Sequence, residues 1–206
     1  MTAVPAPAAT ESRREQILRT AAELFAQRGF RGVSINDIGA AVGVTGPALY
    51  RHFPSKEAVL GEMLVQISRT LLAEGERRAA DAGGGTATLE ALVDWHVAFA
   101  VSQPALISVQ YRDLDHLAET DRREVQQLQR RYVEIWVAAI REAAPGVDEA
   151  HARSAAHAVF GLINSTPHSA RIGPDQMTDL LHRMAMAALA GLDASHGDDT
   201  TRRAPR

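Results

Sequence analysis

The sequence predicts an all-α protein of about nine helices, in which a small N-terminal unit of three helices precedes a larger helical domain. Apolar residues recur at helical spacing along almost the whole chain. Capping residues, glycines and prolines divide this pattern into segments of helical length. We find no run of alternating β-branched residues that would form a convincing strand, so no sheet is expected.

The first two helices are delimited by capping residues. The first is expected over 12–29, with its apolar positions at helical spacing: Ile17, Leu18, Ala21, Leu24 and Phe25. The second is short, with Ser34 as its N-cap and Asp37 at the fourth position of the cap pattern. Gly43 is expected to end it, because glycine adopts a left-handed backbone at little cost.

The third helix is expected over 45–53, with Pro47 in its first turn, where the missing N–H costs nothing. Ser55 then caps a long fourth helix that ends near Ala82. A glycine run follows. Five further helices are expected over 88–103, 105–117, 121–144 (capped by Thr120), 148–163 and 175–192.

The domain boundaries follow from the same pattern. Residues 1–11 and 193–206 lack apolar periodicity and are expected to be disordered. Between them we predict one domain over 12–58 and a second over 59–192. The absence of cysteine, of a secretory signal pattern and of a long apolar run favours a cytoplasmic protein without a membrane span.

The residues at 34–60 form two short helices joined at Gly43, which is the pattern of a helix-turn-helix. One set of apolar residues would pack the two helices against Leu24 and Phe25: Ile38, Val42, Val44, Leu49 and Phe53. The opposite face of the second helix would then be free to enter a major groove of DNA. Although the net charge is −3, residues 1–60 carry seven basic and five acidic side chains, so any basic surface lies at this end.

Several side chains around this helix are suited to phosphate contacts. Ser34 and Lys56 lie at helix N-termini, which attract anions, and Tyr50 and His52 offer side-chain hydrogen bonds. The alternatives are that Tyr50 is a core aromatic and that Lys56 is an ordinary solvated lysine. The arginines of the N-terminal arm are expected to be solvated or to reach the DNA backbone or minor groove: Arg13 and Arg14.

Arg51 is the strongest candidate for reading a base, because arginine pairs bidentately with the edge of guanine. It could equally hold a phosphate. The remaining residues of the predicted reading helix are small and would either meet thymine methyl groups or allow close approach of the backbone: Thr45, Gly46, Pro47 and Ala48.

The segment 13–60 resembles the DNA-binding domain of the TetR family of repressors. The matching stretches are ILRTAAELFAQRGF at 17–30, SINDIGAAVGV at 34–44 and TGPALYRHFPSKEAVL at 45–60. The resemblance implies a homodimer that binds a palindromic operator through recognition helices at 45–53, with phosphate contacts near Tyr50, His52 and Lys56. It also implies an effector pocket in the C-terminal domain that controls the spacing of the two recognition helices.

Polar and aromatic residues in the second domain are candidates for lining that pocket, although ordinary cores contain the same residue types. They are Trp95, His96, Phe99, Tyr111, Arg112, Tyr132, Trp136, Asn164 and His168. Arg112 would either hold an anionic effector or pair with Asp115 or Asp94. This stretch resembles actinobacterial family members linked to lipid or acyl-thioester sensing, which implies a hydrophobic or acyl-type small molecule.

The last two long helices carry a face of small and apolar residues that suits a four-helix interface with a twofold mate. The residues of this face are Ala155, Val159, Leu162, Leu181, Met184, Ala188 and Leu192. The alternative is that they belong to the core of a single chain. Because the resembled family dimerises there, the interface is the preferred interpretation.

The sequence gives no support for an enzyme. It contains no HExxH metal motif, no phosphate-binding glycine loop and no GxSxG, and its histidines are scattered. No cofactor and no metal are therefore expected. The remaining alternative to a regulator is a helical small-molecule-binding or interaction protein without DNA binding. The residues Tyr50, His52 and Lys56 argue against it.

Overall fold

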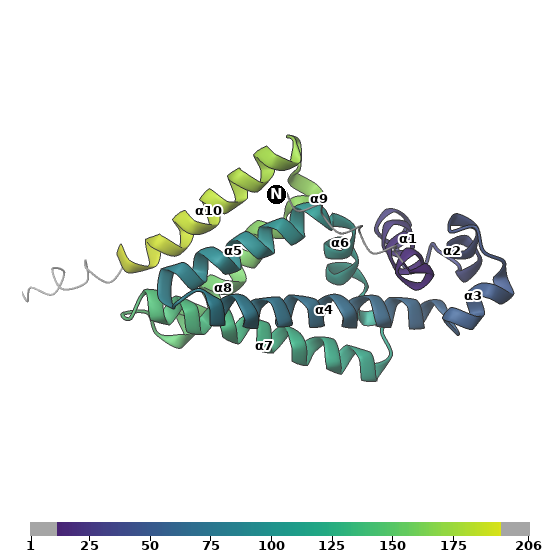
Figure 1. Ribbon diagram of the computed structural model, residues 1–206, viewed down its shortest axis with the longest axis horizontal. Coiled ribbons are helices and arrows are strands. Elements are labelled where there is room, and N and C mark those ends of the chain that lie inside the picture. The colour runs from purple at the N-terminus through teal and green to yellow at the C-terminus, as the bar shows by residue number, and fades with distance from the viewer. Residues whose placement is uncertain (1–11, 195–206) are drawn as a thin grey trace, which may run out of the picture.

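The computed structural model describes residues 12–194 and is all-helical over that range (Figure 1). It contains nine helices of seven residues or more, the four-residue helix α9 and one 3-10 turn. The segments expected to be disordered, 1–11 and 193–206, lie outside the described residues, except that the last helix ends at Ala194.

The N-terminal unit consists of α1 (Arg13–Arg28), α2 (Ile35–Ala41) and α3 (Gly46–His52). Capping boxes begin the first two helices, because the hydroxyls of Ser12 and Ser34 accept from the backbone three residues on, and the acidic side chain there accepts in return. Gly43 has the positive φ of 70° that the turn between α2 and α3 requires. These boundaries agree with the sequence prediction.

Helix α4 (Lys56–Asp81) starts at this unit and runs the length of the molecule beside α7 (Glu119–Ala143), which runs in the same direction (Figure 1). Gly75 lets the two helices approach closely, since a Cβ there would lie 2.7 Å from the ring of Tyr132. The molecule therefore has a continuous rod that joins both ends.

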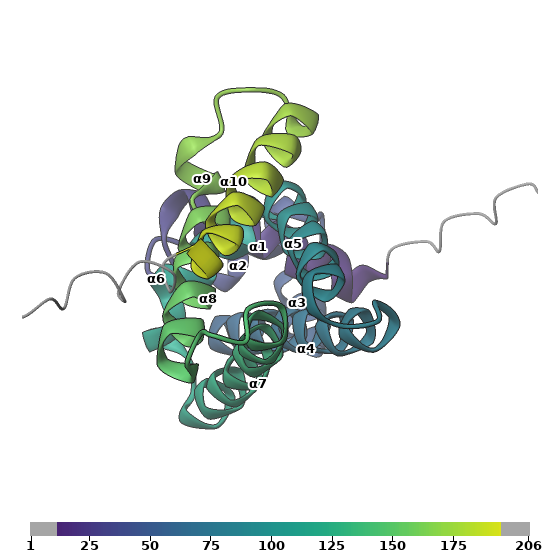
Figure 2. The same cartoon turned by 90° about the vertical axis from the view of Figure 1, so that its left-hand side faces the viewer.

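The second part of the molecule is completed by α5 (Gly85–Ser102), α6 (Pro104–Asp113), the 3-10 turn η1 (Leu114–His116), α8 (Glu149–Ile163), α9 (Thr166–Ser169) and α10 (Pro174–Ala194). Figure 2 shows α5, α8 and α10 on one side of the α4 and α7 pair. Helix α5 and the segment α6–η1 meet at 90°. By length and composition that bent pair could cross a membrane, whereas no single described helix could.

Two helix starts differ from the sequence prediction. Helix α5 begins at Gly85 rather than at Thr88, because Thr88 faces the core instead of capping. Helix α7 begins at Glu119, with Ala118 at the N-cap, so Thr120 lies inside the helix and does not cap it. Glu119 accepts hydrogen bonds from Arg122 and Arg123, and its charge suits a helix N-terminus.

The described residues form two hydrophobic clusters. The first unites the inner faces of α1, α2 and α3 with the start of α4, and it also takes in Val109, Leu117 and Val125 from the α6–α7 region. The second lies among α4, α5, α7, α8 and α10 and contains the fully buried Trp136. Because α6 and α7 contribute to both clusters, the two parts of the chain are packed together rather than joined by a free linker.

Candidate DNA-binding surface and effector cavity

Helix α3 packs one face against the core and exposes the other. Leu49 and Phe53 are buried, as are Ile38 and Phe25, while Leu24 and Val44 are partly buried against the same cluster. Gly39 allows the close crossing of α2 and α3, because a Cβ there would lie 3.3 Å from the Leu49 side chain and the Val44 carbonyl. The packing predicted for the helix-turn-helix is therefore present.

The side chains expected at DNA differ in their exposure. Tyr50 is 51% exposed, so it is not a core aromatic. The other exposed members of the predicted set are Ser34, Thr45, Pro47 and Arg51, and the half-buried members are Gly46, Ala48, His52 and Lys56. The exposed face of α3 is thus made mainly by the residues that the sequence analysis assigned to it.

The side chain of Arg14 has partners within the protein and is not a freely solvated residue of the N-terminal arm. Its Nη1 donates to the carbonyl oxygen of His52 at 2.8 Å, and its guanidinium pairs with Glu62 of α4. The same group lies 4.3 Å above the ring of Phe53. Arg14 therefore connects the end of α3 to α4. Arg13 donates to the Val42 carbonyl at 3.1 Å and holds the end of α2 in a similar way.

Lys56 also has internal partners. Its Nζ donates to the carbonyl oxygens of Phe30 and Val33, both at 3.0 Å, and lies 4.3 Å from the centre of the Phe30 ring. These contacts fix the loop between α1 and α2 against the start of α4. An ammonium group has three donors, so one N–H is left over from this pair of bonds.

We expect Lys56→Met to lower the free energy of unfolding by about 1–2 kcal/mol, because two loop carbonyls lose a charged donor. Urea denaturation of the DNA-free protein measures this. Arg51→Met is the matched control, since it removes a cation from the exposed surface and should change stability by less than about 0.5 kcal/mol. Equal stability of the two variants would show that the Lys56 contacts contribute nothing.

A cavity of about 390 Å³ lies among α4, α5, α6, α7 and α8. It is lined by Ser68, Leu71, His96, Phe99, Ile107, Gln110, Tyr111, Leu114, Gln129, Tyr132, Val133, His157, Phe160 and Asn164. None of these described lining residues is an aspartate, glutamate, lysine or arginine. The volume falls in the range of small-molecule sites in proteins.

A buried hydrogen-bonded relay forms the polar part of the cavity wall. His96 is 4% exposed, and its Nδ1 and Nε2 lie 3.1 Å from the Tyr132 hydroxyl and from Oδ1 of Asn164. Because Nε2 faces an amide oxygen, it carries the proton, and Nδ1 accepts from the Tyr132 hydroxyl. Burial lowers the pKa of His96 to about 4, although the hydrogen bond that its Nε2 donates to Asn164 acts in the opposite direction, so the ring is neutral at pH 7.

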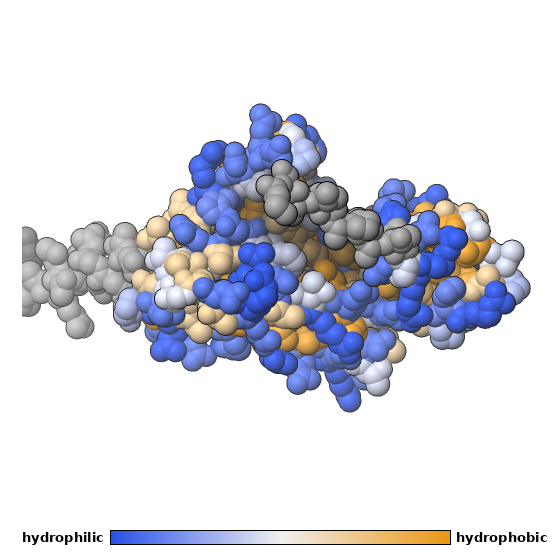
Figure 3. Space-filling view, viewed as in Figure 1, coloured by the Kyte–Doolittle hydropathy of each residue, from blue (hydrophilic) through white to orange (hydrophobic). Residues whose placement is uncertain are grey.

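Five of the nine candidate effector residues line this cavity: His96, Phe99, Tyr111, Tyr132 and Asn164. The other four do not line it. Trp136 is fully buried behind the wall, and His168 is exposed on α9. Trp95 faces a separate groove of about 720 Å³ between α1, α4, α5 and α6, seen as a hollow with hydrophobic residues at its floor (Figure 3). Arg112 is held by other partners, described below.

Sequence reasoning missed most of the apolar and amide wall, including Leu71, Gln110, Gln129 and Phe160. Phe160 lies 5.0 Å from the His96 ring in a stacked arrangement. Its helix contains mainly small residues, so the one large aromatic on it was an available signal.

Two models of known protein families match the chain. The model described as bacterial regulatory proteins, tetR family, matches residues 17–63. The model described as tetracyclin repressor-like, C-terminal domain, matches residues 82–192, which is more than half of the chain. The chain belongs to the TetR family of bacterial regulatory proteins.

Individual relatives agree with this placement. The transcriptional repressor KstR2 of Rhodococcus jostii is 31% identical over 61% of this chain and 62% of its own length, so the chain spans less than two thirds of that relative. The structure of KstR2 of Mycobacterium tuberculosis has a TM-score of 0.78 at 20% identity, covering 89% of this chain and 96% of that one. AibR in complex with isovaleryl coenzyme A and operator DNA has a TM-score of 0.70 at 20% identity, covering 84% and 97%.

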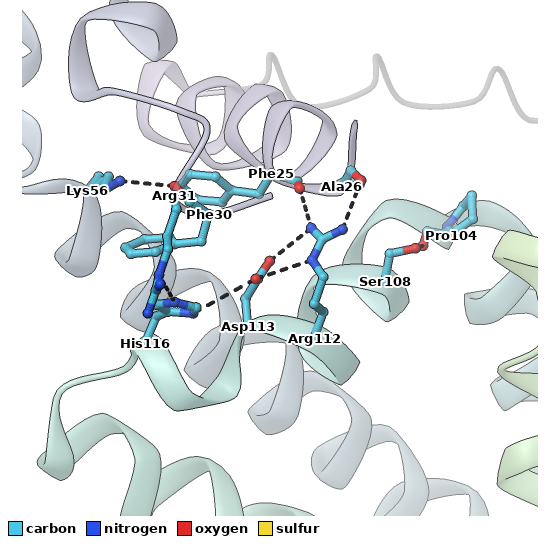
Figure 4. Close-up of polar contacts among 10 residues, drawn as sticks. All are labelled: Phe25, Ala26, Phe30, Arg31, Lys56, Pro104, Ser108, Arg112, Asp113 and His116. Carbon is cyan, nitrogen blue, oxygen red and sulfur yellow. Dashed lines mark hydrogen bonds and ion pairs between the residues drawn. The ribbon is translucent and has the colours of Figure 1, made fainter. Parts of the chain in front are cut away.

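In this TetR-family chain, α6 is fastened to the end of α1 by a polar cluster (Figure 4). Arg112 donates to the carbonyl oxygens of Phe25 and Ala26 and pairs at 3.0 Å with the buried carboxylate of Asp113. Its partner is thus Asp113, neither Asp115 nor Asp94, and Arg112 does not line the cavity. The cation also lies at the C-terminal end of α1, where the helix dipole favours it.

His116 extends this cluster. Its Nδ1 lies 3.9 Å from Asp113, its Nε2 accepts from Nε of Arg31 at 3.2 Å, and its ring lies 4.8 Å from that of Phe30. The segment that follows the cavity wall in α6 therefore contacts the DNA-binding unit through both charged and aromatic groups.

The predicted dimer face of this TetR-family chain is only partly exposed. Val159 and Leu181 are 2% exposed and belong to the core of the chain. Their assignment to an interface is wrong, because side chains buried in one chain cannot contact a partner. Met184 is 46% exposed and Ala188 is exposed, while Ala155, Leu162 and Leu192 are half-buried. Sequence reasoning missed Leu180, which is 36% exposed beside them on α10.

Proposed function

We propose that this protein is a ligand-responsive transcriptional repressor that binds a palindromic operator as a homodimer. The observation that carries the proposal is α3, a seven-residue helix with Tyr50 and Arg51 exposed and Leu49 buried. Such a helix fits a major groove. AibR, a protein of the same fold, is known in complex with isovaleryl coenzyme A and operator DNA. In this role the protein acts in the cytoplasm, where chromosomal DNA is accessible.

The proposed DNA contacts are divided between phosphates and bases. Tyr50, Ser34 and the third N–H of Lys56 are assigned to phosphates, together with His52 at the end of α3. Arg51 is assigned to a guanine edge, and Thr45, Gly46, Pro47 and Ala48 to close approach in the groove. Phosphate contacts supply most of the affinity, and base contacts supply specificity.

The proposed dimer forms through the exposed part of α8 and α10. Met184, Leu180 and Ala188 are exposed apolar side chains on one helix, and the half-buried Leu162 and Ala155 lie on the other. Apolar residues gathered on two helices suit a four-helix interface with a twofold mate. In this proposal, residues 12–58 form the DNA-binding domain and residues 59–192 form the effector-binding and dimerisation domain.

We assign the 390 Å³ cavity to a hydrophobic or acyl-type effector. Its wall includes Ser68 and Leu71 of α4 and Ile107, Gln110 and Tyr111 of α6. Arg14 of α1 pairs with Glu62 of α4 and donates to the His52 carbonyl at the end of α3, and Arg112 of α6 donates to a carbonyl at the end of α1. A ligand that favours one arrangement of these helices shifts the population toward it. Operator release follows if the two readers move away from a spacing of about 34–36 Å.

Selection of genomic DNA fragments by the purified protein tests the class of function. We expect enrichment of one short palindrome. Absence of any enriched site, together with equal affinity for random duplexes at low salt, would contradict the proposal in favour of a helical binding protein without specific DNA recognition. The same measurement identifies the operator for the experiments below.

We expect Arg51→Ala to cost about 1–3 kcal/mol of operator binding and to relax the preference at one base pair in each half-site. Fluorescence anisotropy with the operator and its single-base variants measures both effects. Equal losses on operator and random DNA would reassign Arg51 to a phosphate. Arg69→Ala is a control of equal charge, since Arg69 is exposed far along α4 and pairs with Glu124.

A further inference from the structure

The wall of the effector cavity combines polar and apolar side chains. Eight of its lining side chains carry polar atoms, and yet none of the described lining residues is an aspartate, glutamate, lysine or arginine. An anionic ligand group placed beside His96 and Asn164 would therefore meet no lysine or arginine, and the other histidine of the wall, His157, is exposed. Burying an unpaired carboxylate out of water is strongly unfavourable.

His96 cannot readily supply the missing charge. Its two ring nitrogens are occupied by the Tyr132 hydroxyl and by Oδ1 of Asn164. Protonation would give Nδ1 a proton directed at the Tyr132 hydroxyl, which would have to turn its own proton away. Burial also lowers the pKa of His96 to about 4, so the charged ring is disfavoured at pH 7.

Asn164 supplies a donor instead. Its amide oxygen is used by His96, while within residues 12–194 no hydrogen-bond partner is found for its amide nitrogen. Asn164 is half-buried and lines the cavity next to Phe160 and Phe99. An oriented N–H donor among aromatic rings suits a neutral carbonyl oxygen, which accepts a hydrogen bond without bringing a charge.

We infer that the cavity binds a neutral, largely apolar carbonyl compound, such as a ketone, ester or thioester, and rejects the corresponding free carboxylate. This inference rests on the proposed assignment of the cavity as the effector site. The ligand carbonyl accepts from Asn164, and the apolar body lies against Leu71, Phe99, Val133 and Phe160. A regulator with this selectivity responds to the masked form of an acid and ignores the acid itself.

Two rigid probes of nearly equal shape test the charge selectivity. They are 1-acetyladamantane, a ketone, and adamantane-1-carboxylate, which carry the same cage and differ in the charge of the group attached to it. Trp136 reports occupancy, because its ring lies 5.0 Å from that of Phe160 in the cavity wall. Trp95→Phe leaves Trp136 as the sole tryptophan, since the chain contains two.

At pH 7 the full-length protein should bind the ketone roughly 100-fold more tightly than the carboxylate, because the carboxylate would be buried unpaired. Titrations followed by Trp136 fluorescence and by calorimetry give both affinities. Carboxylate binding within about threefold of ketone binding would overturn the inference. Failure of both probes to bind, in a sample that still binds operator DNA, would overturn it as well.

A variant that should gain affinity for the carboxylate provides a second test. Gln129→Lys places a cation in the wall, whereas Gln127→Lys adds the same charge to an exposed position of α7 outside the wall. Carboxylate affinity should rise at least tenfold in Gln129→Lys only, through a charge-assisted contact. Equal carboxylate affinities in the two variants would overturn the inference. If the ketone binds and operator affinity is unchanged, the ligand class stands and the proposed effector role fails.

Discussion

Gly39→Val should weaken operator binding by roughly 100-fold, toward the level of nonspecific DNA. The position leaves no room for a branched side chain, because even a Cβ would lie 3.3 Å from the Leu49 side chain and from the carbonyl oxygen of Val44. The carbonyl belongs to the turn and cannot rotate away as a side chain could. Helix α3 must therefore shift relative to α2, and its exposed face loses its orientation.

The same substitution should lower the free energy of unfolding by about 1–3 kcal/mol, the usual cost of overpacking. Urea denaturation and operator anisotropy measure the two effects separately. Ala40→Val is the matched control, because it introduces the same side chain at the next, exposed residue of α2. Unchanged operator affinity in Gly39→Val would mean that the α2–α3 crossing does not set the position of the reading helix.

Replacing His96 by Gln should remove a pH dependence of stability worth about 3 kcal/mol between pH 6.5 and pH 4. In the folded protein, burial lowers the pKa of His96 to about 4, while the unfolded chain titrates near the ordinary value of 6.5. As the pH falls through this window, the unfolded state binds a proton that the folded state does not bind. The wild-type protein is therefore fully stabilised by the neutral ring above pH 6.5 and loses that stability as the pH falls to 4.

Glutamine retains a donor and an acceptor for Asn164 and Tyr132 but does not titrate, so His96→Gln should show the smaller loss on acidification. The measurement is the difference in unfolding free energy between variant and wild type at several pH values. His157→Gln serves as the control, since His157 is exposed at the cavity. Parallel stability curves for wild type and His96→Gln would show that His96 is not held neutral.

The two predictions concern parts of the molecule that differ in how far the sequence revealed them. The N-terminal unit depends on local signals: the capping boxes at Ser12 and Ser34, Gly43 at the turn, and the spacing of Leu49 and Phe53. These signals act over a few residues, so the helix boundaries and the exposed face of α3 could be predicted. Arg14 and Lys56 could not be placed, because their partners lie 48 and 26 residues away.

The second domain shows the opposite balance. Its long helices were predicted to within a few residues, whereas the short α9 was not predicted. Trp95, Arg112, Trp136 and His168 were assigned to a cavity that they do not line. Helical spacing shows which residues share a face, and it does not show whether that face meets a cavity, a core or another helix. Val159 and Leu181 were misplaced for the same reason, since a core and an interface require the same apolar residues.

The sequence by itself determined the helical class, the order of the helices and the reading face of α3, because capping, periodicity and turn chemistry act locally. Only the tertiary structure decided that His96, Tyr132 and Asn164 meet in one relay around a cavity without charged walls, and that Arg112 fastens α6 to α1. Those arrangements join residues far apart in the chain. They depend on how α4, α5, α7 and α8 pack together, which no local pattern encodes.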